Sequence, residues 1–327
     1  MKGYPKISIV TPSFNQGGFI EQTILSIINQ NYPNLEYIII DGGSTDNTIE
    51  IIRKYADLIT YWVSEPDNGQ SHAINKGLER CTGELFNWIN SDDYLEDGAL
   101  LKIGNKYLET NADIICGYSS IFNDTTKNEL MKHRTEIFLN VESTIVQQKI
   151  NQQAMFYKLS IIKILGNVNS NLNFVMDLEL WFRYLCKFGQ HRIVLIDNLI
   201  AHFRIHGNSK TDNYQYKFRE EENAIWNYIV IKHGVNNNWV TNFVTHELYR
   251  FKNNFEFNDI NIRKLEIALS HKYFYTLYNI GNIKLSRIAF LTLLKGQELT
   301  FNFQSLSMFV KLFIGNIPFR KFFKNHG

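Results

Sequence analysis

Short apolar runs alternate with amphipathic segments through the first third of the chain. Residues 6–11 and 37–40 are rich in β-branched side chains and are typical of buried strands. The segment between them places Ile20, Ile24 and Ile27 on one face of a helix. A strand and helix alternation of this kind predicts a mostly parallel sheet with helices on both faces. We therefore expect an α/β fold of the Rossmann-like type.

The pattern changes in the second half of the chain. Residues 118–150 are more polar and less regular, which indicates a mobile loop or a hairpin. A strong helical pattern follows over residues 177–187, and the pattern stays helical from about residue 215 to the end. We expect an α/β domain over residues 1–230 and a helical C-terminal region over residues 231–327.

Composition narrows the class of protein. The net charge of +2 on 327 residues gives no global field that favours nucleic acid as a partner. The three cysteines, Cys81, Cys116 and Cys186, lie far apart and show no zinc-ligand spacing, which indicates a reducing compartment. We found no signal peptide and no apolar run of about 18 residues or more, so we expect a cytoplasmic protein.

Two adjacent carboxylates, Asp92 and Asp93, follow the apolar run 85–89. Ligands of open α/β sheets gather at the carboxyl ends of such strands. Neighbouring carboxylates disfavour each other's charge unless a positive group lies nearby. A divalent metal beside a phosphate-bearing substrate would meet that need, whereas the alternative is a solvated acidic turn.

Other polar residues follow the remaining predicted strands. Asp41 ends the second strand, where it either caps a turn or contacts the base or ribose of a nucleotide. Residues 11–15, Thr-Pro-Ser-Phe-Asn, are either a simple strand exit or one wall of a nucleotide pocket. In the second case Phe14 offers a stacking surface for the base, and Asp67 follows the third strand at the same edge.

Taken in order, these segments resemble the family 2 glycosyltransferases of GT-A fold. The resemblance covers about residues 6–211. It is carried by SIVTPSFNQ (8–16), SIINQNYPNLEYIIIDGGSTDNT (26–48), SEPDNGQSHAINKG (64–77), TGELFNWINSDDYLEDGAL (82–100), INQQAMFYK (150–158), FVMDLELWFRY (174–184) and AHFRIHGNSKT (201–211). The most similar subgroup contains bacterial enzymes that build O-antigen, capsule or other surface polysaccharide.

The resemblance implies inverting transfer of a sugar from a nucleoside diphosphate donor to a glycan or lipid-linked acceptor. It implies that Asp41 meets the nucleotide base, with Thr11 and Pro12 lining the same pocket. Asp92 would face the ribose or the metal, and Asp93 would bind Mg²⁺ or Mn²⁺ directly. The metal would bridge the diphosphate and stabilise the charge that develops as it leaves.

The resemblance also assigns the acceptor side. Asp177 stands where the family carries its catalytic base, and Glu179 is the alternative base. His206 would close over the diphosphate or complete the metal shell, the alternative being a surface histidine in a loop. Relatives usually carry an acidic residue where this chain has His72, so His72 would alter donor recognition.

Two other functions are compatible with this pattern. One is a nucleotide-sugar-binding or scaffolding subunit of a polysaccharide assembly complex that has no turnover. The other is a nucleotidyltransferase, which would expect a glycine-rich phosphate loop with a basic residue after the first strand. Residues 12–18, Pro-Ser-Phe-Asn-Gln-Gly-Gly, contain no such basic residue.

The C-terminal tail combines an apolar face with basic side chains. The segment from Gly281 onward contains seven basic residues and one acidic residue, Glu298. A basic, Phe-rich amphipathic stretch suits the surface of an anionic membrane, here the cytoplasmic face of the inner membrane. The alternative is a helical bundle packed on the catalytic domain. The predicted amphipathic positions are Leu306, Phe309, Val310, Phe313 and Ile314.

Overall fold

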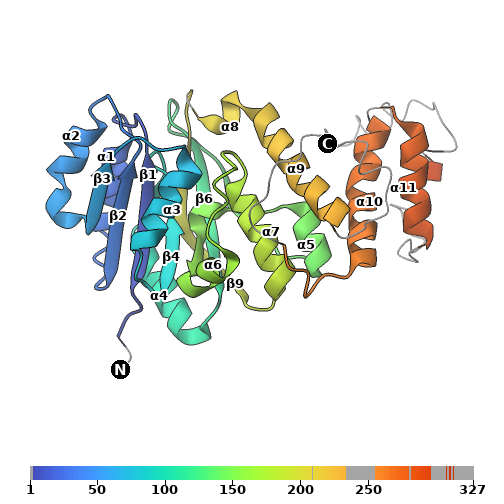
Figure 1. Ribbon diagram of the computed structural model, residues 1–327, viewed down its shortest axis with the longest axis horizontal. Helices are drawn as coiled ribbons and strands as arrows, with labels where there is room; N and C mark the ends of the chain where they lie inside the picture. Colours follow the sequence, from blue (N-terminus) through green and yellow to red (C-terminus); the bar gives the residue numbers. More distant parts are fainter. Residues whose placement is uncertain are drawn as a thin grey trace.

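A single mixed sheet organises the chain (Figure 1). The computed structural model describes residues 3–207, 209–232, 255–279, 281–295, 307, 309–310 and 312. Within these residues nine strands form the sheet, in the order β3-β2-β1-β4-β8-β6-β9-β5, with β7 paired to β6. The strands are β1 (Ile7–Ser13), β2 (Leu35–Asp41), β3 (Tyr61–Ser64), β4 (Leu85–Trp88), β5 (Tyr94–Leu95), β6 (Ile114–Asn123), β7 (Glu129–Arg134), β8 (Met155–Lys158) and β9 (Ile193–Ile205).

The strands that carry the predicted site run in parallel. β1 pairs in parallel with both β2 and β4, and β2 pairs in parallel with β3. Ser13 lies opposite Asp41, and Asp41 lies opposite Ser64, so the carboxyl ends of these strands share one edge. β8 enters antiparallel between β4 and β6, after which β6 and β9 again pair in parallel. The predicted α/β fold is confirmed, but the sheet is mixed: among the described strands four pairings are parallel and four are antiparallel.

Helices cover both faces of the sheet because the strand residues alternate between two cores. Ile38 and Ile40 join the core under α3, α6 and α7, whereas Ile39 joins the core under α1, α2 and α4. The helices are α1 (Ile20–Ile28), α2 (Thr48–Lys54), α3 (Gln70–Arg80), α4 (Ala99–Thr110), α5 (Val141–Gln147), α6 (Leu159–Leu165) and α7 (Met176–Phe188), with short 3₁₀ turns at Ala56–Leu58 and Gln152–Ala154.

Two segments differ from the expected pattern. The irregular stretch 118–150 contains a β-hairpin, because β6 continues to Asn123 and turns back into β7, and α5 follows. The strand expected over residues 192–196 runs on to Ile205 as β9. Pairing with β6 holds this longer strand across two register shifts, and those shifts interrupt the apolar alternation that sequence analysis detects.

The C-terminal region is helical, as predicted. It contains α8 (Lys210–Asn213), α9 (Gln215–Lys232), α10 (Ile262–Asn279) and α11 (Ile283–Lys295). α10 packs on α5, and its Phe274 and Leu277 share the core of the α/β layer with α7. The boundary expected at residue 230 falls inside α9. No helix among the described residues is long and apolar enough to cross a membrane.

Candidate active site

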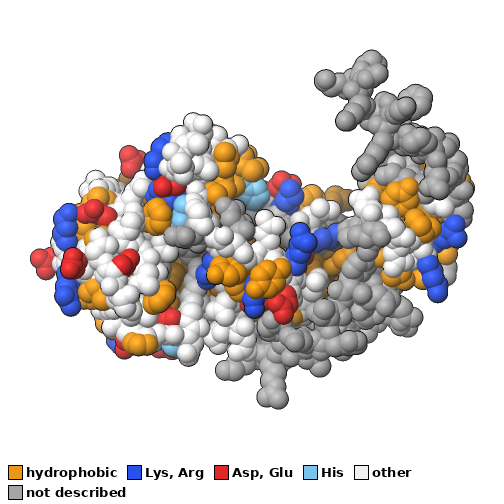
Figure 2. Space-filling view, turned by 90° about the horizontal axis from the view of Figure 1, so that it is seen from above, with side chains coloured by type: hydrophobic (Ala, Val, Ile, Leu, Met, Phe, Trp, Pro, Cys, Tyr) orange, Lys and Arg blue, Asp and Glu red, His pale blue; other side chains and the backbone are white. Residues whose placement is uncertain are grey.

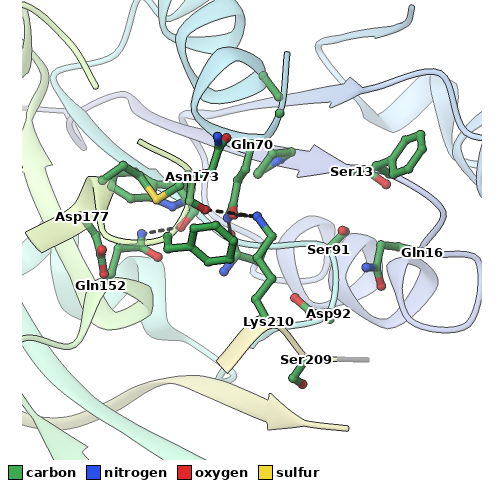
Figure 3. A pocket seen from close by; sticks show the side chains of 18 of the residues that line it. Ser13, Gln16, Gln70, Ser91, Asp92, Gln152, Asn173, Asp177, Ser209 and Lys210 are labelled. Carbon is green, nitrogen blue, oxygen red and sulfur yellow. Dashed lines mark hydrogen bonds between the residues drawn. The ribbon is translucent and has the colours of Figure 1, made fainter. Parts of the chain in front are cut away.

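A cavity of about 500 Å³ opens at the carboxyl ends of β1, β2 and β4 (Figure 3). Ser13 lies at one end, and Asp177 with Gln152 lies at the other. The cavity therefore joins the predicted nucleotide wall to the predicted base. Of the predicted site residues, those that line it are Pro12, Phe14, Asp67, Asp92 and Asp177.

Asp41 and Thr11 lie behind the nucleotide wall. The Asp41 carboxylate is fully buried and accepts hydrogen bonds from Gly43 N (3.1 Å), Ser44 N (2.8 Å) and the hydroxyls of Ser44 (2.5 Å) and Ser64 (2.6 Å). Thr11 is also buried, and its hydroxyl accepts from the Tyr37 hydroxyl at 3.2 Å. Neither side chain lines the cavity: Asp41 holds the turn at residues 43–44 beside it, and Thr11 bonds to the neighbouring strand.

The loop after β1 is tied to the loop after β2. Asn15 adopts a left-handed backbone conformation, with φ of 51°, and its side-chain oxygen accepts from Thr45 N at 2.8 Å. Its own backbone amide donates to the Ser44 hydroxyl at 2.7 Å. Asn15 thus fixes the wall that presents Phe14, which is 59% exposed beside the cavity.

Asp67 and His72 occupy the turn between β3 and α3. Asp67 accepts from Gly69 N at 2.8 Å, and its carboxylate lies against Gly42, where an added Cβ would come within 2.8 Å of Oδ2. A side chain at position 42 would therefore require the Asp67 carboxylate to shift. His72 Nδ1 accepts from Asn68 N at 3.1 Å, which places the ring on the turn and not among the cavity-lining residues.

The two adjacent carboxylates after β4 point in different directions. Asp92 lines the cavity, and its Oδ2 lies 3.1 Å from His206 Nε2. Asp93 is 1% exposed and accepts from Arg204 N at 3.0 Å and Asn90 Nδ2 at 3.3 Å. Burial and the neighbouring Asp92 charge raise the pKa of Asp93 well above its usual range. The geometry therefore differs from the expectation that Asp93 is the residue exposed to the metal.

Arg204 ties this acidic turn to the sheet. Its guanidinium donates to Asp92 O at 2.8 Å and to Gln22 at 2.5 Å, and it also pairs with Asp124. The same guanidinium lies over the rings of Phe19 and Phe122, each with a centroid 5.1 Å away. Arg204 thus holds the backbone that presents Asp92, and the Phe19 ring also contacts the His206 ring at 4.4 Å.

Asp177 and Glu179 have different environments. Asp177, in the first turn of α7, lines the cavity, and its removal from water raises its pKa to about 6 against the lowering effect of the helix amides. Glu179 is fully buried and pairs with Arg183, with Nε–Oε2 of 2.9 Å and Nη2–Oε2 of 2.8 Å. Of the two carboxylates, Asp177 reaches the cavity, and Glu179 joins a buried ion pair.

The sequence of this chain is similar to those of known proteins. A model of the protein family described as glycosyl transferase family 2 matches residues 8–163. The chain carries a family 2 glycosyltransferase domain. It is 34% identical over 136 residues to the putative teichuronic acid biosynthesis glycosyltransferase TuaG of Bacillus subtilis, covering 40% of this chain and 54% of that protein. It is 30% identical over 164 residues to the poly(ribitol-phosphate) beta-N-acetylglucosaminyltransferase TarP of Staphylococcus aureus, covering 49% of this chain and 48% of that protein.

Solved structures share the fold of this glycosyltransferase. Residues 1–349 of S. aureus TarS in complex with UDP superpose with a TM-score of 0.58 at 14% identity, over 94% of this chain and 86% of that chain. The mannosyltransferase PcManGT of Pyrobaculum calidifontis, in complex with GDP-Man and Mn²⁺, gives 0.53 at 15% identity, over 94% and 79%. At these identities the likeness establishes the GT-A fold alone.

The glycosyltransferase offers two side chains to a divalent metal. Asp92 lines the cavity, and buried His206 lies behind it with Nε2 3.1 Å from Asp92 Oδ2. Among the described residues no group of three or more His, Cys, Asp or Glu gathers to hold an ion. Mg²⁺ and Mn²⁺ accept carboxylate ligands, and Mg²⁺ commonly completes its shell with waters and substrate phosphates. Two protein ligands therefore fit a metal that arrives with a diphosphate.

Sequence reasoning did not assign several polar residues of the glycosyltransferase cavity. Lys210 reaches across the middle of the cavity, where its Nζ donates to Gln70 Oε1 at 2.9 Å and Asn173 O at 3.3 Å (Figure 3). Gln70 in turn donates to Asn90 Oδ1 at 2.6 Å. All of them lie within or beside the segments that carry the family resemblance, so position in those segments was the available signal.

Proposed function

We propose that the protein transfers a sugar, with inversion, from a nucleoside diphosphate donor to a glycan or lipid-linked acceptor in bacterial surface polysaccharide synthesis. The observation that carries this proposal is one cavity lined by both Asp92, which contacts His206, and Asp177. TuaG and TarP, which share sequence with this chain, are glycosyltransferases named for teichuronic acid and poly(ribitol-phosphate). A TarS structure in complex with UDP-GlcNAc supports a nucleotide-sugar donor.

The nucleoside would lie against the wall formed by Pro12, Phe14 and Gly42. Phe14 presents an exposed ring for stacking on the base. Asp41 would contribute by holding the backbone from Gly42 to Ser44 through its four hydrogen bonds. In this account Thr11, Asn15, Asp67 and His72 support the wall and the adjoining turn.

Asp92 and His206 would hold Mg²⁺ or Mn²⁺ with the donor diphosphate. When bound, the metal supplies a Lewis acid that stabilises the charge developing on the departing phosphate. Asp93 would act indirectly, because its bond to Arg204 N and the Arg204 bond to Asp92 O together set where Asp92 lies. Lys210 adds a positive charge in the middle of the same cavity.

Asp177 would take the proton from the acceptor hydroxyl as that oxygen attacks the anomeric carbon. The new C–O bond forms as the bond from the anomeric carbon to the phosphate oxygen breaks, and the diphosphate leaves with the electron pair. Attack from the face opposite the leaving group inverts the anomeric configuration. A pKa of about 6 leaves Asp177 ionised at neutral pH, which the base role requires.

The donor can be identified by thermal unfolding. We expect one class of nucleoside diphosphate sugar, together with Mn²⁺, to raise the unfolding temperature of the full chain, because a ligand that binds the native state stabilises it. The matching nucleoside with Mn²⁺ is the control and should stabilise less, since it lacks the diphosphate. A panel in which no nucleotide sugar stabilises the protein more than its nucleoside would refute the donor assignment.

The pH dependence of turnover follows from the environment of Asp177. We expect kcat/KM to be nearly constant above pH 7 and to fall about tenfold per pH unit well below pH 6, because protonated Asp177 cannot accept the acceptor proton. Steady-state kinetics between pH 4.5 and 8.5, with saturating metal at each pH, would measure the profile. A profile without an acidic limb would argue against a carboxylate base.

Contact with the membrane surface is proposed through α11. Ile288, Leu291 and Leu294 are exposed on this helix, and hydrophobic side chains lie beside Lys and Arg on the C-terminal helices (Figure 2). The Phe309 ring lies 6.3 Å from that of Phe290 on α11, and Arg287 donates to Leu312 O at 3.4 Å, contacts that support the bundle alternative for these tail residues. Of the other predicted tail positions, Leu306, Phe313 and Ile314 lie outside the described residues.

Substituting the exposed face of α11 should weaken membrane contact. We expect the triple variant Ile288→Ser, Leu291→Ser, Leu294→Ser to lose most co-flotation with vesicles that contain anionic lipid, because it removes apolar area from the contact surface. Donor-induced stabilisation should be unchanged. Equal flotation of the variant and the parent protein would refute a role of α11 in membrane binding.

A further inference from the structure

A glutamate on α9, Glu221, accepts hydrogen bonds from the backbone segment that leads into α7. Glu221 is 5% exposed. Its Oε1 accepts from Asn173 N at 2.9 Å, and its Oε2 accepts from Phe174 N at 2.9 Å and Val175 N at 3.1 Å. Val175 is the N-cap of α7 and makes no side-chain capping bond of its own. Glu221 therefore satisfies, from a distant helix, three backbone amides of the segment that ends at the N-cap of α7.

Side-chain contacts reinforce the same junction. Phe218, one turn before Glu221 on α9, packs edge-on against Phe174 with ring centroids 5.3 Å apart. Lys210 donates to Asn173 O at 3.3 Å. The three-residue segment 173–175 is thus held by backbone and side-chain contacts, and Asp177 follows it by two residues.

We propose that Glu221 is a positioning residue for sugar transfer: it fixes residues 173–175 and thereby places the Asp177 carboxylate at the cavity. This inference rests on the proposed function, in which Asp177 is the base. A carboxylate offers two acceptor oxygens to three amides, whereas a glutamine offers one oxygen and turns an N–H₂ group toward N–H donors. A displacement of about 1 Å in a reacting group can cost about 100-fold in rate.

The charge of Glu221 also acts on Asp177. Burial is the main cause of the raised pKa of Asp177, and the negative charge of Glu221 raises that pKa further. Tyr157 on β8 is the other titratable group coupled to Asp177, and Lys210 shares its cavity. Neutralising Glu221 should therefore lower the pH at which activity is half lost, an effect that a purely mechanical contact would not produce.

Glu221→Gln and Glu220→Gln form a matched pair of variants. Each variant removes one negative charge, and the two positions are neighbours on α9. Glu220, however, makes none of the three bonds to residues 173–175. For Glu221→Gln we expect kcat to fall by about 10- to 100-fold. KM and thermal stabilisation by the donor should be unchanged, and the acidic midpoint of kcat/KM should lie below that of the wild type. Glu220→Gln should behave as wild type.

A third variant separates the effect of side-chain length from the effect of charge. Glu221→Asp keeps the charge but shortens the side chain, so we expect a reduced kcat with an acidic midpoint close to that of the wild type. Hydrogen exchange at the amides of 173–175 should increase in both Glu221 variants and not in Glu220→Gln.

The outcomes distinguish the inference from the function on which it rests. Full turnover by Glu221→Gln, with wild-type turnover established, would overturn the inference alone. So would a loss of kcat that merely parallels a loss of folded protein and donor binding, with an unchanged acidic midpoint. No turnover by the wild type with any donor would overturn the proposed function and this inference together.

Discussion

Replacing Asp177 by asparagine is expected to lower kcat for sugar transfer by about 100- to 10 000-fold while the protein stays folded. Asparagine keeps the shape of the side chain but cannot take a proton from the acceptor hydroxyl. Because burial raises the pKa of Asp177, its charged form disfavours folding at neutral pH. The unfolding temperature of Asp177→Asn should therefore equal or exceed that of the wild type. Single-turnover kinetics and thermal unfolding measure the two effects.

Glu179 provides the contrast for this experiment. Glu179→Gln leaves the buried Arg183 guanidinium without its carboxylate partner, and breaking such a pair costs about 3–5 kcal/mol of folding free energy. We expect its main effect on stability and not on the turnover of the folded fraction. Near-normal turnover by Asp177→Asn, with kcat lost in a folded Glu179→Gln protein, would transfer the base role to Glu179.

Asp92→Asn is expected to remove the response to Mn²⁺. Donor and metal together should no longer raise the unfolding temperature, and transfer should fall by about 1000-fold, since a Lewis acid contributes several kcal/mol to such a transition state. The reason is that Asp92 lines the cavity, and its Oδ2 lies 3.1 Å from His206 Nε2. Titration of Mn²⁺ against unfolding temperature and rate measures both losses.

Asp93→Ala should have a different signature. It leaves the buried Arg204 amide without its acceptor, at a cost of about 1–3 kcal/mol in stability, and it frees the turn that carries Asp92. We expect weaker folding together with a residual metal response at higher Mn²⁺ concentration. A stable Asp93→Ala protein that ignores Mn²⁺, beside an Asp92→Asn protein that still responds, would make Asp93 the direct ligand.

The sequence predicts the sheet edge well because each strand there is short, apolar and ended by polar turn residues. Asp92, expected at that edge, and Asp177, expected from the family resemblance, both line one cavity, and their roles stay predictions. The orientation of Asp92 relative to Asp93 could not be predicted, because adjacent residues of a turn point apart and the Arg204 amide that captures Asp93 lies on β9. β9, which carries that amide, extends well beyond the strand expected over residues 192–196.

Contacts between residues far apart in the sequence account for the features that sequence patterns did not predict. Arg183 on α7 is 1% exposed, because Glu179 and the Leu165 and Asn167 carbonyls satisfy its donors. The sequence around Glu221 does not indicate its role, because its carboxylate oxygens accept from amides 46 to 48 positions earlier in the chain. Such contacts depend on how α7 and α9 pack, which neither periodicity nor spacing reveals.

Product analysis tests the central claim most directly. Incubation of the full chain with its stabilising donor, Mn²⁺ and a glycan acceptor should release one nucleoside diphosphate for each new glycosidic bond, and NMR should show the anomeric configuration opposite to that of the donor. Release of pyrophosphate would indicate a nucleotidyltransferase, and binding without any product would indicate a non-catalytic subunit. A retained anomeric configuration would contradict the single displacement with Asp177 as base.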